Sequence, residues 1–199
     1  MQRVAPGPYS LQLAYVVPGT TPSLAPPIHI PDGYQPDAVL PSGILIQEIR
    51  QGGALRVWRP AASGGGDFVR MLGQAEGVID TFGDLVAWVD GSGACHAQAL
   101  CPLHITNAAS GADSVVGVPN GHQPVPGGSF SPDGTRLAFF VDTSANGEPA
   151  AELATVGADS GWSRPALVAQ GILPFSGDGP AASAAPGNLR PVPGPKSAT

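Results

Sequence analysis

Short apolar runs separated by turn residues recur along the middle of the chain. The run LVAWVD at residues 85–90 returns as LAFFVD at 137–142, and a looser version, ILIQEI, lies at 44–49. Each run is followed by a Gly-containing turn and two further apolar segments, and each is preceded by a weaker one. Segments rich in Val, Ile, Leu and aromatic residues with turn signals between them predict β-strands. The pattern therefore predicts an all-β region with four antiparallel strands in every 40 to 50 residues or so, which is the period of a propeller blade.

The repeats divide the chain into three parts. Residues 37–173 hold the repeats, and residues 1–36 form a Pro-rich lead in which regular structure is not expected. Residues 174–199 are rich in Pro, Ala, Gly and Ser, and we expect a disordered tail because such a segment buries too little apolar surface. The repeats themselves have the approximate bounds 37–76, 77–122 and 124–171. The alternative is a meander or sandwich whose strands share only their composition.

The third repeat contains the most specific motif of the chain, FSPDGTRLAF at residues 130–139. Pro132 presets φ for a tight turn that begins at Ser131, Asp133 can accept hydrogen bonds from backbone amides, and Gly134 tolerates a positive φ. The motif resembles the F-S-P-D-G-x-x-[LIV]-[AV]-F run of TolB-like and WD40-like β-propeller repeats. The corresponding turns of the first two repeats lack it. The resemblance implies three four-stranded blades of a propeller with irregular segments at both ends.

A propeller of three blades has an incomplete ring. Complete propellers have about four to eight blades, and closure keeps the apolar faces of the blades out of water. The resemblance therefore implies that a protein partner or a second copy of this chain completes the ring, or that the chain is a fragment, which we favour. Propeller repeats of this kind are scaffolds or substrate-binding domains, so the family implies a binding surface rather than a reaction.

The charge of the chain argues against several partners. Nine Lys and Arg residues against fifteen Asp and Glu residues leave a net charge of −6, and Lys196 is the only lysine. Phosphate backbones are held by clustered Lys and Arg, so nucleic acid is not an expected partner. The sequence also contains no apolar window approaching the roughly twenty residues of a membrane-spanning helix. Abundant Ala, Gly, Pro and Arg beside so little Lys indicate a GC-rich, bacterial source.

Cys95, His96, Cys101 and His104 form the densest cluster of reactive side chains. A disulfide between the two cysteines, a zinc site and free thiols are the alternatives, and the spacing is not a standard zinc-ligand spacing. We favour the disulfide and predict no metal site. A disulfide implies an oxidising compartment, whereas the first residues lack the features of a signal peptide. We therefore expect an extracytoplasmic or cell-surface location if the N-terminus is incomplete, and a cytoplasmic one otherwise.

The sequence offers little support for catalysis. It has no G-x-S-x-G elbow, no distinctive pair of carboxylates and no Gly-rich loop followed by lysine, so we predict no catalytic residue and no cofactor. Trp162 and Arg164 lie in a predicted hairpin, where a partly exposed Trp beside an Arg is typical of a partner contact. We expect a non-catalytic binding or scaffolding module that recognises a protein or an extracytoplasmic ligand. The alternatives are an accessory or substrate-binding domain of a hydrolase, and a truncated fragment without independent function.

Overall fold

The computed structural model describes most of the repeat region and parts of both ends. The described residues are 9–12, 14–15, 23–24, 26–62, 64–93, 101–118, 123–143, 151–171 and 190–191. The predicted tail at 174–199 lies outside them except for its residues 190–191, and so do Cys95 and His96. In the described part, β-strands form nearly all of the regular structure, which confirms the all-β class.

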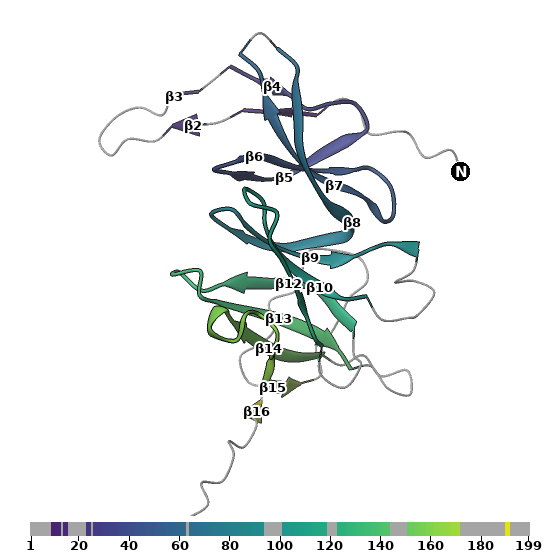
Figure 1. The fold of residues 1–199 in the computed structure, drawn as a ribbon, viewed down its shortest axis with the longest axis vertical. Helices are drawn as coiled ribbons and strands as arrows, with labels where there is room; N and C mark the ends of the chain where they lie inside the picture. Colours follow the sequence, from purple (N-terminus) through teal and green to yellow (C-terminus); the bar gives the residue numbers. More distant parts are fainter. Residues whose placement is uncertain are drawn as a thin grey trace, which may run out of the picture.

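Two antiparallel sheets contain most of the strands, and each strand pairs with the next along the chain. The seven-stranded sheet consists of β5 (Tyr34–Leu40), β6 (Gly43–Glu48), β7 (Gly53–Pro60), β8 (Gly66–Phe82), β9 (Leu85–Asp90), β10 (Leu103–Asn107) and β11 (Asp113–Val116). The five-stranded sheet consists of β12 (Gln123–Phe130), β13 (Arg136–Asp142), β14 (Ala151–Gly157), β15 (Ala166–Gly171) and β16 (Arg190–Pro191). The strands of the three repeats follow one another along the long axis of the molecule (Figure 1).

The long strand β8 connects the first two predicted repeats without a turn at their boundary. We expected two separate four-stranded sheets that meet at residues 76 and 77, but β8 runs through this point without a break. Its first half pairs with β7 and its second half with β9, and Ala75 alone is paired on both sides. A β-bulge lies between Ala75 and Gly77, where the strand changes register without ending. The first two repeats therefore belong to one sheet.

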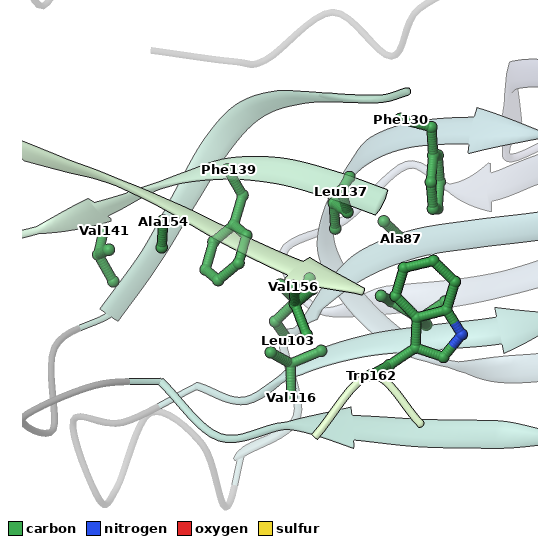
Figure 2. Packing of buried hydrophobic residues seen from close by; sticks show 11 residues of the cluster. Ala87, Leu103, Val116, Phe130, Leu137, Phe139, Val141, Ala154, Val156 and Trp162 are labelled. Carbon is green, nitrogen blue, oxygen red and sulfur yellow. The ribbon is translucent and has the colours of Figure 1, made fainter. Parts of the chain in front are cut away.

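Successive repeats nevertheless pack face to face. Val86 of β9 is fully buried against the first repeat, in a cluster with Leu45 and Leu55, whereas the adjacent Ala87 is fully buried in the cluster that contacts the third repeat. Figure 2 shows this second cluster, in which Leu103 and Val116 of the second repeat lie near side chains of the third. The third repeat contributes Phe130, Leu137, Phe139, Val141, Ala154, Val156 and Trp162. Strands with two apolar faces are thus buried on both sides.

The lead covers the outer face of the first repeat. In this segment β1 (Ser10–Leu11) pairs with β4 (Ile28–His29), and β2 (Ala14–Tyr15) pairs with β3 (Ser23–Leu24). A third apolar cluster contains Ile44, Ile46 and Trp58 of the first repeat together with Ile30, and Tyr9, Leu11, Ile28 and Tyr34 pack against it. The lead therefore contains short paired strands. It covers an apolar end face of the first repeat, which the sequence suggested would need a partner.

The position of Trp88 depends on a glycine of β8. A Cβ atom at Gly73 would overlap with the indole ring of Trp88, which packs over this point of the strand. The φ of Gly73 is not positive, so the backbone itself would accept alanine and the cost is steric. At Gly73 the backbone of β8 therefore lies directly against the indole ring of Trp88.

We predict that Gly73→Ala lowers the free energy of unfolding by about 1–3 kcal/mol, because the added methyl group displaces the buried indole. Gly117→Ala is the matched control, since a Cβ atom there would meet only the carbonyl oxygen of Ser163 at 3.8 Å. Urea unfolding of the two variants measures the difference. Equal midpoints for both variants would contradict the close approach of Trp88 to β8.

Candidate functional site

A cavity of about 480 Å³ lies between the first strands of the first two repeats. Residues of β5, β6 and the second half of β8 line it. β5 is an edge strand, and the second half of β8 pairs only with β9, so the cavity lies beside two strand edges that are not paired with each other. The first two repeats thus meet at an apolar cluster and, beside it, at this largely polar cavity.

Two β-bulges place acidic residues at this cavity. The pairing of β5 with β6 shifts register between Pro36 and Ala38, which leaves Asp37 without a partner across the strands. The pairing of β8 with β9 shifts in the same way around Glu76. Bulges redirect side chains, and they are enriched at sheet edges and beside functional sites. Both bulge residues, Asp37 and Glu76, line the cavity.

Gln47 is the most deeply buried polar residue of the cavity wall, with an exposed fraction of 7%. Its Nε2 atom donates a hydrogen bond of 2.6 Å to the carbonyl oxygen of Ala75. Because this bond fixes the nitrogen as the donor, the Oε1 atom can only accept. Oε1 accepts no hydrogen bond from the part of the chain that the structure describes. The buried side-chain atoms without a partner in the described part are Ser42 Oγ and Arg56 Nε, so Oε1 faces solvent in the cavity and is not a buried acceptor.

Asp37 has an environment that disfavours its charge. Partial desolvation by the surrounding walls raises the pKa of this carboxyl from 3.8 to about 6, although the residue as a whole is exposed. Asp37 makes no hydrogen bond or ion pair with the other described residues. Only burial acts on the carboxyl, and no neighbouring cation offsets it.

Asp80 has a different role in the same wall. Its Oδ2 atom accepts hydrogen bonds from the backbone N–H of Phe130 at 2.7 Å and from the Oγ of Ser129 at 3.0 Å. These bonds connect β8 to the first strand of the third repeat, β12. In a similar way, Asp84 accepts a bond of 2.9 Å from the backbone N–H of Ser42 and connects the turns of the first two repeats.

The chemistry of the cavity is that of hydrogen-bond acceptors. Three carboxylates and the Gln47 amide oxygen line it, and the described lining contains no Lys, Arg, His or Cys. Among the described residues, no group of three His, Cys, Asp or Glu side chains is arranged to hold a metal ion. Gln35 and Thr81, which also line the cavity, can donate as well as accept hydrogen bonds.

The predicted turn residues lie outside the cavity, at the contact between the second and third repeats. Ser131 and Thr135 donate hydrogen bonds to Asp133, and these bonds lower the pKa of Asp133 to about 2. Pro132 lies in the turn, and Gly134 has a φ of +69°. A Cβ atom at Gly134 would overlap with the ring of Phe82. The turn is therefore shaped by its own hydrogen bonds and by close packing on the second repeat.

The partial exposure expected at Trp162 is wrong. The residue is only 9% exposed and belongs to the core between the second and third repeats, where its ring meets Phe130 edge-on at 6.0 Å between centroids (Figure 2). Gly161 and Trp162 both adopt positive φ, and this turn directs the indole inward. Arg164 is exposed, so the two residues do not form one surface.

Of the predicted cysteine cluster, only Cys101 and His104 lie within the described residues. Cys101 is buried and disulfide-bonded, whereas its predicted partner Cys95 lies outside the described residues, so the pairing remains a prediction. His104 stacks on Trp88 at 4.4 Å between ring centroids, and its Nδ1 lies 2.8 Å from Asp113. His104 is thus a packed residue of β10.

Comparison of the chain with protein-family models, with curated proteins and with solved structures finds no match. Within the described ranges, no helix has the length and apolar character needed to cross a membrane.

The sequence interpretation missed the cavity residues. Gln47 interrupts an otherwise apolar run and is the one signal that was readable, because a polar residue in a buried strand needs a partner. Asp37 and Glu76 carried no such signal, since the bulges that redirect them depend on pairing with distant strands.

We predict that Asp37→Asn changes how stability depends on pH. Between about pH 4 and pH 6 the unfolded chain loses the Asp37 proton while the folded protein keeps it, so the folded state loses stability as pH rises through this window. The variant lacks this loss, and it should match the parent near pH 4 and exceed it at pH 7. Urea unfolding at both pH values, with Asp32→Asn as a control in an exposed turn, measures the effect. Parallel profiles for parent and variant would contradict the raised pKa.

Proposed function

We propose that this chain is a non-catalytic binding module, built from propeller-type repeats, that recognises a ligand through the cavity between β5 and β8. The observation that carries the proposal is the cavity between these strands, whose lining brings together the Gln47 amide and the side chains of Asp37, Glu76 and Asp80. A cavity of a few hundred Å³ with a small number of converging polar groups is the usual form of a ligand site. The ligand is either a small extracytoplasmic molecule or a side chain of a protein partner.

Contacts between equivalent parts of the repeats support the propeller proposal. The turn between the first and second strands of one repeat contacts the corresponding turn of the next repeat. Ser42 and Asp84 make this contact between the first and second repeats, and Phe82 and Gly134 make it between the second and third. The first strands β8 and β12 are linked through Asp80. In a propeller, first strands lie side by side around the axis, and the cavity would then lie near this axis.

The same proposal identifies the face at which further blades would be added. The outer face of the first repeat is covered by the lead. The third repeat has half-buried apolar side chains on the side away from the core, including Phe140 and Leu153. A protein partner or a second copy that completes the propeller would therefore contact the third repeat.

Light scattering tests the second copy as the completing partner. We expect the mass to rise from 20.0 kDa towards twice that value as concentration increases, because each chain offers the same apolar face. Phe140→Asp should hold the protein in its monomeric form, with Phe68→Asp as a control at an exposed aromatic residue of the first repeat. A monomeric mass at every concentration would rule out the second copy.

We also propose an oxidising location, either extracytoplasmic or at the cell surface. The disulfide at Cys101 supports it, because disulfides persist in oxidising compartments and are rare in the cytosol.

A ligand screen with a blocked cavity tests the binding function. Thermal unfolding is measured with a set of amines, sugars, carboxylates and short peptides, since any probe that binds the folded state raises the midpoint. We expect at least one probe to raise the midpoint of the parent and to have no effect on Gln35→Trp, in which an indole fills the cavity. Gln51→Trp adds the same ring in an exposed turn and should respond like the parent. Equal responses of the two variants, or no response to any probe, would refute the proposed function.

A further inference from the structure

We infer that the free edge of β8 at residues 66–71 binds an extended segment of another protein by strand addition, and that Arg56 beside this edge pairs with an acidic side chain of that segment. The inference does not depend on the cavity between β5 and β8. It assigns a second interaction surface to the first repeat, together with the kind of partner that fits it.

The first half of β8 has an unpaired edge in the part of the chain that the structure describes. Residues 66–75 pair with β7, and the pairing with β9 begins only at Ala75. No described strand is hydrogen-bonded to the other side of residues 66–71. Such an edge offers a row of backbone donors and acceptors, and only another extended chain can pair with it along its length.

The side chains at this edge are exposed, and several are apolar. Phe68, Val69 and Met71 are 47%, 41% and 52% exposed. Edge strands are commonly protected from pairing by Lys, by Pro or by a covering segment. Residues 66–71 contain neither Lys nor Pro, and the described part of the chain leaves them uncovered. This edge is therefore suited to accept a strand.

The third repeat shows the corresponding edge with a strand added to it. β15 is the fourth strand of that repeat, as the first half of β8 is the fourth strand of the first repeat. β16 pairs with the outer edge of β15, with Pro191 opposite Ala169 and Arg190 opposite Gln170. An outer strand of this fold thus accepts a segment from elsewhere in the chain, and the first repeat offers the same position unoccupied by any described strand.

Arg56 of β7 provides a charge without a counter-charge beside the edge. Its side chain is partly buried, and its Cζ atom lies 5.3 Å from the centroid of the Phe68 ring. The Nε atom is buried without a hydrogen-bond partner, and Arg56 forms no hydrogen bond or ion pair with the other described residues. By contrast, the guanidinium groups of Arg59 and Arg70 each donate a hydrogen bond to a backbone carbonyl oxygen. Arg56 therefore lacks an acceptor.

An acidic side chain on the added strand would supply this acceptor. Alternate side chains of a strand lie on the same face of the sheet, so a strand paired with β8 places one of its side chains beside Phe68. A guanidinium stacked on an aromatic ring keeps its N–H groups available for a carboxylate. In strand addition the backbone bonds provide affinity and the side chains provide specificity. Here the specificity would come from an Asp or Glu that pairs with Arg56.

Fluorescence anisotropy with labelled synthetic peptides tests the inference. The probes are octapeptides of alternating Val and Thr, flanked by Gly and Ser for solubility, in which a single Glu replaces each Thr in turn to sample the register. We expect at least one Glu peptide to bind the parent protein. Its Gln counterpart should bind at least tenfold more weakly, because it lacks the carboxylate. A version with N-methylated backbone amides should also bind at least tenfold more weakly, because it cannot pair with β8.

Three variants complete the test. Arg56→Gln should bind the Glu and Gln peptides equally. Arg59→Gln removes the same charge from the same strand and should keep the preference for Glu, because this guanidinium donates to the carbonyl oxygen of Ser42. Gln35→Trp, which fills the cavity, should bind the peptides like the parent, so that failure at the edge and failure at the cavity are distinguished.

Four outcomes would count against the inference. Equal binding of the N-methylated peptide would overturn strand addition, and equal binding of the Glu and Gln peptides by the parent would overturn the role of Arg56. No binding of any peptide would overturn the inference and leave the proposed cavity function untouched. Self-association of the parent that Phe68→Asp abolishes would identify a second copy, rather than another protein, as the occupant of the edge.

Discussion

Burial of both apolar faces of each sheet is the constraint on which this structure depends. The adjacent residues Val86 and Ala87 of β9 are both fully buried, one against the first repeat and the other against the third. Full burial of a Val, Leu or Phe side chain contributes about 1.5–3 kcal/mol, so no repeat can leave one of its faces in water without a large cost. The repeats must therefore lie against one another, and the lead must cover Trp58 and its neighbours on the outer face.

Stacking of this kind requires small residues and polar links at particular points. Gly73 lies under the ring of Trp88, and Gly134 lies against the ring of Phe82, so these two rings fit between the repeats because a Cβ atom is missing at each point. At the strand edges, where apolar packing ends, Asp80 and Asp84 accept hydrogen bonds from backbone N–H groups of the neighbouring repeat. The apolar faces hold the repeats together, and the aspartates align their first strands.

The cavity follows from this alignment. Edge strands carry bulges more often than central strands, and the bulges at Asp37 and Glu76 place two carboxylates between strands that do not pair with each other. The carboxyl of Asp37 is thereby desolvated without a counter-charge, which costs stability and raises its pKa. Groups perturbed in this way are concentrated at functional sites, where a ligand offsets the cost.

The sequence alone determined the strand content, the position of strands such as β6, β9 and β13, and the turn residues from Ser131 to Gly134, because alternation of residue types and turn chemistry are local properties. It did not determine that β8 continues through Ala75, that the lead covers Trp58, or that Trp162 points into the core. These features depend on which surfaces meet across long stretches of chain. Only the tertiary structure decided them, and only it brought Asp37 and Gln47 to one cavity, since register and bulges are set by pairing between distant strands.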